Sequence, residues 1–340
     1  MLEKPQVSVV IPTYNCADYL GAAIRSVLQQ TFADFELFVL DNASTDHTPA
    51  LVQQFHDERL IYMRNPQNVG FVGNVALGLQ QARGPLITYL GADDLWEPEF
   101  LRKSVACLDA NPGATFVHTT ALWIDETGQV FGQSSMNWPS ITSGTEAFLL
   151  CFRDGYCNSA MLMRTEPLRK SGGIDMSWGD LADTGMFLRL CLEGNVCYIK
   201  ENLARYRVHR QNVSSGLYRQ GKYFQLYLCL AEQAFDWPRA RQLALHQKRA
   251  LGLQYLVADS VKALHLVRAS GTRRDFLRSF SELAAAAPQI LQSPSTWARF
   301  AFGLLPRPVI FGLQRWKRQR WAKTAASSLN LTPRIANVSR

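Results

Sequence analysis

The sequence lacks the patterns of several protein classes. It has 340 residues with seven cysteines, an odd number, and no Cys-x-x-Cys pair, so buried thiols in a reducing compartment are expected rather than a disulfide framework. No signal peptide is expected, because the chain opens Met-Leu-Glu-Lys-Pro and the short apolar run that follows ends at Pro12. These absences favour a cytoplasmic protein.

Glycine is missing where a dinucleotide-binding enzyme needs it. The first predicted strand, residues 7–11, runs into Pro-Thr-Tyr-Asn-Cys. A dinucleotide-dependent oxidoreductase carries a G-x-G-x-x-G turn at this place, where glycine lets the backbone approach a pyrophosphate. The sequence therefore disfavours that class.

Acidic residues are missing after Glu282. The whole chain carries a net charge of +8 and nine lysines and arginines follow Glu282, so residues 1–282 carry a net charge of −1. This asymmetry indicates a separate partner surface near the C-terminus. The nine basic residues are Arg299, Arg307, Arg315, Lys317, Arg318, Arg320, Lys323, Arg334 and Arg340.

What the chain does contain is a regular alternation of predicted strands and helices. Apolar runs at residues 7–11, 35–40 and 86–90 predict strands, and each is accompanied by polar residues at its carboxyl end. Leu20, Ile24 and Val27 then recur at helical spacing. Repeated β-loop-α units indicate a parallel sheet covered by helices, and 47% apolar residues are ample for its core.

The most informative loop is Gly91-Ala92-Asp93-Asp94, which directly follows the third of these strands. Ligands of open α/β sheets bind beyond the carboxyl ends of the strands, and aspartate oxygens suit a hard cation that bridges to a diphosphate. For this pair taken alone, a solvated turn that caps the next helix is the alternative.

Five motifs in a fixed order resemble those of the inverting family 2 glycosyltransferases. The resemblance covers residues 7 to about 215 and implies the GT-A fold, a Rossmann-like, mixed and mostly parallel sheet with helices on both faces. It also implies transfer of a sugar from a nucleotide sugar to an acceptor hydroxyl. The motifs are Val-Ile-Pro-Thr-Tyr-Asn at 10–15, residues 41–46, Asn68-Val69-Gly70 with Asn74, Asp93-Asp94, and Tyr206-Arg207-Val208-His209.

The resemblance implies a donor site at the first four motifs. Tyr14 would stack on the nucleobase and Asp41 would accept a ring N–H, with a UDP-sugar as the first expectation. Ordinary turn and capping chemistry is the alternative for these residues. The implied donor-binding set is Pro12, Thr13, Tyr14, Asn15, Asp41, Asn42, Asn68, Gly70, Asn74, Ala92 and Asp93.

The resemblance also implies a metal site. Residues 91–94 correspond to the family's Asp-x-Asp element, but Gly91 stands where many members have the first aspartate. Asp93 is therefore the expected ligand of Mg²⁺ or Mn²⁺, and His209 is expected to contact the metal or the diphosphate. Asp94 and Arg207 are weaker candidates.

A general base is implied at Asp183, where members usually carry Glu-Asp and this chain has Ala182-Asp183. A helix predicted to begin there would favour the ionised form of the carboxylate through its dipole. A plain N-cap is the alternative, Asp180 is the competitor, and Trp178 lies nearby in the sequence. The two missing acids leave open a catalytically silent nucleotide-sugar-binding protein.

We expect residues 1–218 to form the catalytic domain and residues 219–340 to form a helical C-terminal region. The nucleotide-sugar half would span residues 1–118 and the acceptor half residues 119–218. The aromatic residues Trp123, Trp138 and Tyr156 are expected acceptor-side walls for sugar rings, with a core position as the alternative. A saccharide or a lipid-linked saccharide is the expected acceptor.

Aromatic and basic residues alternate in the C-terminal region. Trp297, Phe300 and Leu304 share one predicted helical face, and Trp-Lys-Arg-Gln-Arg-Trp follows at 316–321. This composition suits a bilayer interface, so we expect residues 297–323 to dock on an anionic membrane at its cytoplasmic face. Packing on the catalytic domain or on a second copy of the chain is the alternative. No nucleic-acid-binding signature accompanies the cluster.

Overall fold

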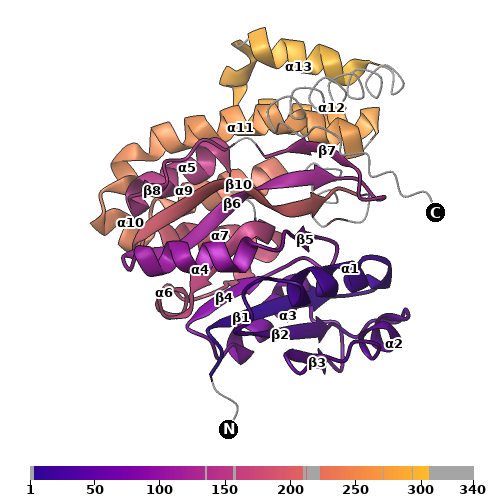
Figure 1. Cartoon of the computed structure of the whole chain (residues 1–340). Coiled ribbons are helices and arrows are strands. Elements are labelled where there is room, and N and C mark those ends of the chain that lie inside the picture. Colours follow the sequence, from indigo (N-terminus) through magenta and orange to yellow (C-terminus); the bar gives the residue numbers. More distant parts are fainter. Residues whose placement is uncertain are drawn as a thin grey trace, which may run out of the picture.

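The computed structural model describes residues 4–305 except 135, 156–157, 210–211, 213–222, 271 and 293. Within these residues a single mixed sheet forms the centre of the molecule, with strand order β3-β2-β1-β4-β9-β6-β10-β5 (Figure 1). Two further strands extend it, since β7 pairs with β6 and β8 pairs with β10. The predicted fold class is confirmed.

The N-terminal part of the sheet is parallel and deeply buried. All residues of β1 and β2 are buried, because helices cover the sheet on both faces. The edge strand β3 is only half-buried and was missed in the sequence, where Leu-Ile-Tyr-Met-Arg is short and does not alternate. The elements are β1 (Val7–Thr13), α1 (Ala17–Leu28), β2 (Phe35–Asp41), α2 (Thr48–Val52), β3 (Leu60–Arg64), α3 (Gly70–Gln81) and β4 (Leu86–Tyr89).

In the second part of the sheet, β9 determines the strand directions. It is antiparallel to both β4 and β6, and β10 is parallel to β6. As a result β1, β4, β6 and β10 all point the same way. The elements are β5 (Leu95–Trp96), α4 (Phe100–Ala110), β6 (Ala114–Ile124), β7 (Val130–Gln133), β8 (Ile141–Thr142), α5 (Gly144–Asp154), η1 (Asn158–Ala160), β9 (Met161–Arg164), α6 (Thr165–Lys170), η2 (Met176–Leu181), α7 (Ala182–Cys191) and β10 (Asn195–Arg207).

The apolar core lies on the two faces of the sheet. One cluster includes Val75 of α3, Phe148 of α5 and Phe187 of α7, and the other includes Leu20 of α1 and Phe100 of α4. Because each helix buries one apolar face against the sheet, the functional loops are left at the strand ends.

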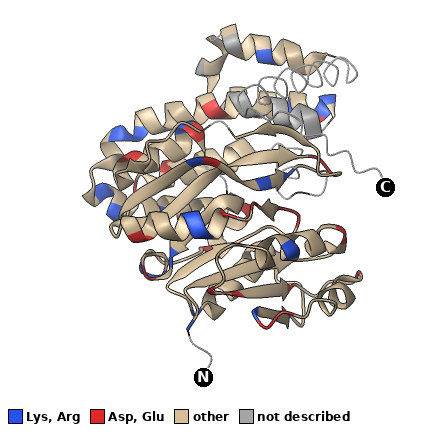
Figure 2. Ribbon diagram, in the orientation of Figure 1, with Lys and Arg blue, Asp and Glu red and all other residues tan. Residues whose placement is uncertain are grey.

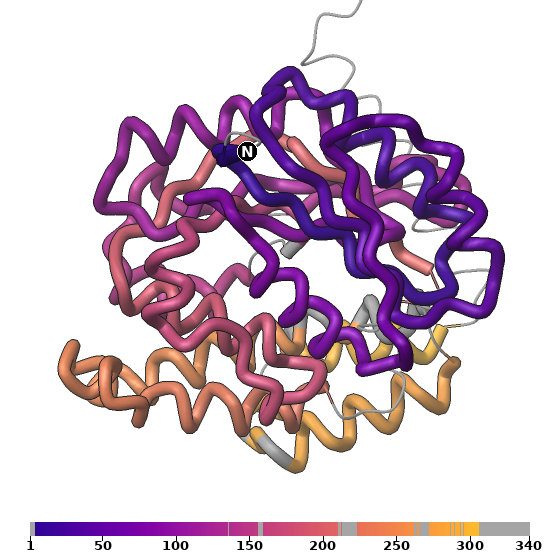
Figure 3. Tube along the Cα trace, turned by 90° about the horizontal axis from the view of Figure 1, so that it is seen from below, coloured from indigo at the N-terminus to yellow at the C-terminus, as the bar shows by residue number. Residues whose placement is uncertain are grey.

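Helices α9 to α13 follow the sheet and lie along one side of it (Figures 1 and 3). Tyr227 and Leu230 of α9 join the sheet core, whereas Phe276 and Phe280 of α12 belong to a separate cluster. These helices carry both acidic and basic positions (Figure 2). The elements are α9 (Tyr223–Ala234), α10 (Pro238–Gln242), η3 (Leu245–Lys248), α11 (Arg249–Ser270), α12 (Arg273–Ala286), η4 (Pro288–Gln292) and α13 (Pro294–Leu304).

Part of the surface expected to meet a membrane packs on protein instead. The ring of Phe300 in α13 lies 4.4 Å from that of Phe280, so this face of α13 is used against α12. Trp297 stays 48% exposed. Among the described helices, none has the length and apolar composition needed to cross a bilayer. Residues 306–323 of the expected docking segment lie outside the described residues.

The expected acceptor-side aromatics differ in position. Trp138 is 5% exposed and its ring lies 4.5 Å from that of His118, so it is a core residue, which was the alternative. Trp123 is half-buried on β6 and its ring faces Phe131 of β7 at 6.2 Å. Tyr156 lies outside the described residues.

His118 makes the fold sensitive to acid. It is fully buried on β6, no described residue hydrogen-bonds to either ring nitrogen, and burial lowers its pKa from 6.5 to about 3. Between pH 6.5 and about pH 3, His118 is therefore protonated in the unfolded chain and neutral in the folded chain. The free energy of unfolding should therefore fall as pH drops from about 6.5 towards 3, by up to about 1.4 kcal/mol per pH unit.

Urea denaturation between pH 4.5 and 7.5 measures this slope. His118→Leu should flatten it, whereas His56→Leu, at an exposed histidine, should keep it. An unchanged slope in the His118 variant would show that other groups cause the acid sensitivity.

Candidate active site at the carboxyl edge of the sheet

The predicted site residues gather at one edge of the sheet because their strands are parallel. The loops after β1, β2 and β4 leave this edge, and so do the segments after β6 and β10. The antiparallel β9 starts there, which brings the preceding η1 to the same place. The edge is therefore built from segments between 12 and 212 in the sequence.

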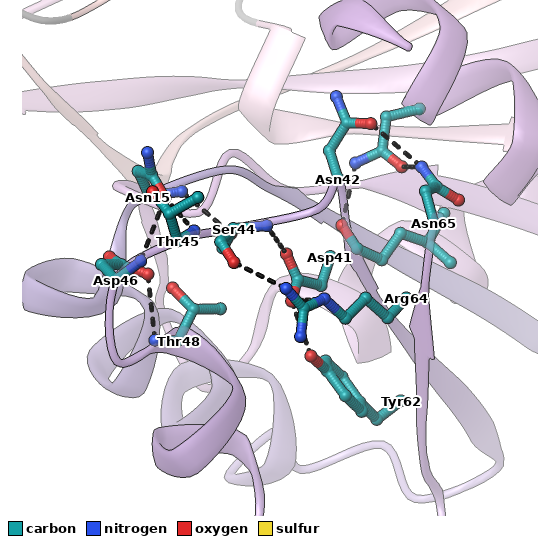
Figure 4. A network of polar contacts seen from close by, with 12 residues as sticks. Asn15, Asp41, Asn42, Ser44, Thr45, Asp46, Thr48, Tyr62, Arg64 and Asn65 are labelled. Atoms are coloured by element: carbon teal, nitrogen blue, oxygen red, sulfur yellow. Dashed lines mark hydrogen bonds and ion pairs between the residues drawn. The ribbon is translucent and has the colours of Figure 1, made fainter. Parts of the chain in front are cut away.

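The turns after β1 and β2 are tied together through Asn15 (Figure 4). Its side-chain Oδ1 accepts the backbone N–H of Thr45 at 2.7 Å, and its own N–H donates to Ser44 Oγ at 3.0 Å. Asn15 has φ 47°, a left-handed conformation that asparagine tolerates better than most residues. Asn15 thus shapes the turn that presents Tyr14, which is 47% exposed, while Pro12 and Thr13 are buried at the end of β1.

Asp41 lies at the base of this turn and is fully buried. Its Oδ1 accepts the N–H of Ser44 at 2.8 Å, and its Oδ2 accepts the hydroxyl of Tyr62 at 2.6 Å. The guanidinium of Arg64 lies 3.5 Å from the same Oδ2, and burial raises the pKa of Tyr62. A nucleobase N–H directed at Asp41 would share its oxygens with these two β3 residues, which sequence reasoning missed together with their strand.

Four asparagines fix the loop that follows β3. Asn42 donates to Asn68 Oδ1 at 2.8 Å, and Asn65 donates to both Asn42 Oδ1 and Asn74 Oδ1, at 3.0 and 2.9 Å. Asn74 in turn donates to the carbonyl of Leu40 at 2.8 Å. Gly70, with φ 78°, adopts a conformation that glycine reaches without strain. The predicted residues Asn42, Asn68 and Asn74 thus support the donor-side loops from within.

Asp93 and His209 meet across the edge. His209 Nε2 lies 2.8 Å from Asp93 Oδ2, and the amide of Asn212 donates to the same oxygen at 3.0 Å. No described residue donates to Asp93 Oδ1, while Ala92 before it is buried. Asn212, which the sequence motif did not single out, also accepts the N–H of His209 at 2.6 Å and so fixes that loop.

The glycine at position 91 has a steric reason. A Cβ atom there would lie 2.8 Å from Asp93 Oδ1 and 3.0 Å from Asp94 Oδ2. An aspartate at 91 would therefore require both carboxylates to move. Gly91 therefore leaves the space that the Asp93 and Asp94 carboxylates occupy in this loop.

Asp94 has a structural role. It is 2% exposed, its Oδ1 accepts the N–H of Arg207 at 2.8 Å, and its Oδ2 accepts the hydroxyl of Ser159 in η1. Burial, reinforced by the charge of Asp93, raises the pKa of this carboxyl well above its usual value. Asp94 therefore joins the loop of residues 91–94 to η1 and β10, and both of its carboxylate oxygens accept hydrogen bonds from protein groups.

The donor atoms at Asp93 and His209 fit a weakly held divalent cation. The described residues contain no group of three His, Cys, Asp or Glu side chains that could hold a metal alone. One carboxylate oxygen and one imidazole nitrogen would complete the shell of a cation whose other ligands are diphosphate and water oxygens, as Mg²⁺ and Mn²⁺ allow.

Asp183 lies in the first turn of α7, as predicted. Its Oδ1 accepts the N–H of Thr184 at 2.6 Å, and the Tyr89 hydroxyl at the end of β4 lies 3.5 Å from its Oδ2. These hydrogen bonds favour the ionised form, as expected of a helix start, but burial has the larger effect and raises the pKa of Asp183 to about 6. The competitor Asp180 is exposed in η2, whereas Trp178 packs against the core.

A cavity of about 550 Å³ opens at the other edge of the sheet, and none of the predicted site residues line it. Arg164 and Arg169 in its wall donate to the carbonyls of Leu108 and Ala82, at the ends of α4 and α3. Of the residues that the structure describes, the predicted site residues therefore lie away from this cavity.

Fold and site together define a GT-A type protein. The described sheet resembles that of S. aureus TarS residues 1–349, with a TM-score of 0.58 over 83% of this chain and 81% of that chain, at 16% identity. TarS 1–349 in complex with UDP gives a TM-score of 0.54 at 16% identity over 84% and 91%. The mannosyltransferase PcManGT from Pyrobaculum calidifontis, in complex with GDP-Man and Mn²⁺, gives 0.52 at 18% identity over 88% and 86%. At these identities the likeness shows the fold.

Sequence comparisons point to glycosyltransferases. Residues 8–172 match the model of the family described as Glycosyl transferase family 2. An uncharacterized glycosyltransferase of Nostoc sp. is 30% identical over 213 residues, which cover 61% of this chain and 66% of the relative. The Escherichia coli UDP-Glc:alpha-D-GlcNAc-diphosphoundecaprenol beta-1,3-glucosyltransferase WfaP is 26% identical over 216 residues, 63% of this chain and 82% of the relative.

Asp93→Asn should abolish metal-dependent donor binding and leave the fold intact. The change removes the charge of a partly exposed side chain, 21% accessible, and little from the core. Isothermal titration calorimetry of UDP with and without MnCl₂ measures the effect. Unchanged metal-dependent binding would refute the assignment of Asp93.

Asp94→Asn is the matched comparison. Its amide oxygen can keep the N–H of Arg207, but its N–H₂ replaces the oxygen that accepts from Ser159, so that hydroxyl must turn to accept; the expected loss is in thermal stability, by about 1 kcal/mol. We therefore expect the Asp93 variant to lose donor binding and the Asp94 variant to lose stability.

Proposed function

We propose that this protein transfers a sugar from a nucleotide-sugar donor to an acceptor hydroxyl with inversion at the anomeric carbon. Two contacts support the proposal: Asp93 lies 2.8 Å from His209, and Asp183 contacts Tyr89, the last residue of the strand that precedes the Asp93 loop. The match to the family 2 model supports the reaction class. Inversion rests on a single displacement in which Asp183 is the one proposed base.

The donor proposed is a UDP-sugar. The titles of similar structures name UDP and UDP-GlcNAc for TarS, and WfaP is named for UDP-Glc. In this chain Tyr14 would stack on the base and the Asp41 turn would hold it. Asp93 and His209 would hold Mg²⁺ or Mn²⁺, which supplies positive charge to the departing nucleoside diphosphate.

Asp183 is the proposed general base. A carboxylate with a pKa near 6 is mostly ionised at pH 7 and still basic enough to take a proton from an attacking hydroxyl. As the acceptor oxygen attacks the anomeric carbon, its proton passes to Asp183 Oδ2 and the bond to the diphosphate oxygen breaks. The amide of Thr184 and the hydroxyl of Tyr89 hold the carboxylate in place.

The acceptor proposed is a saccharide, free or linked to lipid, in the synthesis of a cell-surface polysaccharide or glycolipid. The name of WfaP includes a diphosphoundecaprenol-linked sugar, and the basic, aromatic sequence after residue 297 suits a protein that works at the cytoplasmic face of a membrane. A catalytically silent binding protein is the alternative. Metal-dependent hydrolysis of the sugar nucleotide, with or without acceptor, would exclude it.

Asp183→Asn should lose turnover by about 10²–10⁴-fold while the affinity for the donor stays nearly the same, because the amide cannot accept the proton. In the wild type, kcat/KM should fall as pH is lowered through about 6, where the carboxylate becomes protonated. Steady-state kinetics with a UDP-sugar between pH 5 and 8 measures both. Asp180→Asn is the control and should keep most activity; the reverse behaviour of the two variants would overturn the assignment.

Removing residues 306–340 should release the protein from anionic liposomes. The truncation takes away eight basic residues and two tryptophans but leaves α13, whose Phe300 packs on Phe280. Flotation with vesicles containing phosphatidylglycerol measures binding, and thermal unfolding checks that the rest stays folded. A wild-type protein that does not float would favour the packing alternative for this region.

A further inference from the structure

Arg207 occupies the junction of four segments at the carboxyl edge. It is the last residue of β10, and it is 5% exposed although its side chain carries a full charge. Since β10 is parallel to β6 and β6 to β4, its end reaches the loops that follow both strands. The position gives Arg207 access to donor-side and acceptor-side segments at once.

The guanidinium of Arg207 is held by backbone carbonyls from two of these segments. Its Nε donates to the carbonyl of Asp93 at 2.8 Å, and its Nη1 donates to the carbonyls of Asp125 and Glu126 at 3.0 and 3.3 Å. Asp125 and Glu126 form the tip of the β6–β7 hairpin. The planar guanidinium of Arg207 therefore bridges the loop of residues 91–94, called the metal loop below, and the tip of the β6–β7 hairpin.

The backbone of Arg207 and the face of its guanidinium contact two further segments, the one at Asn212 and helix α1. Its N–H donates to Asp94, its carbonyl accepts from Asn212 at 3.0 Å, and its Cζ lies 4.7 Å from the ring centre of Tyr19 in α1. The ring of Tyr19 also faces that of His209 at 5.2 Å. Arg207 thus contacts four described segments around Asp93 and His209.

The hairpin tip is itself a rigid turn. The side chain of Asp125 accepts the N–H groups of Thr127 and Gln129, each at 3.0 Å, and its carbonyl accepts the N–H of Gly128 at 3.0 Å. These hydrogen bonds hold the tip together as one turn, and the Arg207 guanidinium joins that turn to the Asp93 carbonyl. Trp123 and Phe131 stand on the same hairpin, on the side predicted for the acceptor.

The charge of Arg207 is unusual in its surroundings. Within the described part of the chain no carboxylate oxygen lies within 4 Å of its guanidinium, so carbonyl dipoles and the Tyr19 ring stabilise it. Its charge also acts on the buried carboxyl of Asp94, whose pKa it lowers against the larger effect of burial.

We propose that Arg207 is a positioning residue that couples the acceptor-side hairpin to the metal loop. By fixing the Asp93 carbonyl and the carbonyls of residues 125 and 126 in one plane, it sets where the Asp93 carboxylate lies relative to the acceptor wall. Occupation of the donor site then restrains the hairpin tip. The inference rests on the proposed function for its role in transfer, while the coupling itself can be observed without catalysis.

Arg207→Lys and Arg207→Met separate positioning from charge. Lysine keeps the charge but cannot reach carbonyls on both segments with a planar fork, and methionine removes both. Positioning predicts that both variants bind UDP in the presence of MnCl₂ about tenfold more weakly and lose about 10²-fold in kcat/KM. If the role were electrostatic, the lysine variant would resemble the wild type and the methionine variant would bind Mn²⁺ more tightly, which would overturn the proposal.

Hydrogen exchange of residues 124–130 in the full chain tests the coupling directly. In the wild type, UDP with MnCl₂ should slow exchange at this tip, and in Arg207→Lys that response should be lost. Arg205→Met is the matched control, because Arg205 is a β10 arginine whose partner is Glu97 on the surface, and it should respond like the wild type. A wild-type tip that ignores UDP and MnCl₂ would refute the coupling.

Two further readouts keep the outcomes distinct. Tyr19→Leu removes the ring under the guanidinium and should weaken the tip response in part, which covers the case in which Arg207→Met does not fold. If UDP with MnCl₂ slows exchange at the tip but no sugar is transferred to any acceptor, the proposed function fails and the coupling stands. If transfer occurs and Arg207→Lys matches the wild type, the coupling fails and the function stands.

Discussion

Strand direction is the constraint on which the site depends. Because β9 enters antiparallel between β4 and β6, the later strands β6 and β10 return to the direction of β1 and β4, and their carboxyl ends reach one edge. The buried carboxyl of Asp94 then closes this edge by accepting from Ser159 and Arg207. Together with the contacts of Asp93 to His209 and Asn212, that junction joins two segments that lie more than a hundred residues apart in the sequence.

Burial assigns different tasks to chemically identical side chains along this edge. Asp93 is partly exposed and faces His209, Asp94 next to it is buried and holds the backbone, and Asp183 is held near α7 with a pKa close to neutrality. The same principle applies to arginine, since Arg205 pairs with Glu97 at the surface whereas Arg207, two residues later on the same face of β10, bridges carbonyls inside. Solvent access and the hydrogen bonds available therefore decide the chemistry that each residue can perform.

The local signals in the sequence were sufficient for much of the fold and for the edge of the sheet at which the candidate site residues gather. The apolar runs of β1, β2 and β4 and the polar residues after them identified the parallel sheet and its functional edge, because side-chain periodicity and turn chemistry act over a few residues. The sequence did not predict strand β3, because Leu60–Arg64 is short and only half-buried. Tyr62 and Arg64, which lie beside Asp41, were therefore not predicted as part of the site either. Trp138 was indistinguishable from a surface aromatic until the structure placed it beside His118.

The sequence by itself determined which chemical groups the edge would contain: the Tyr14 turn, Asp41, the Asp93-Asp94 pair, Asp183 and the His209 motif. Only the tertiary structure decided which of them act together, that Asp93 pairs with His209 and Asn212, that Asp94 supports Arg207, and that Asp183 is buried enough to raise its pKa to about 6. The physical reason is the separation along the chain over which each kind of interaction acts. Strand and turn formation depend on neighbours along the chain, whereas ionisation and metal binding depend on desolvation and on contacts between segments that only the folded sheet brings together.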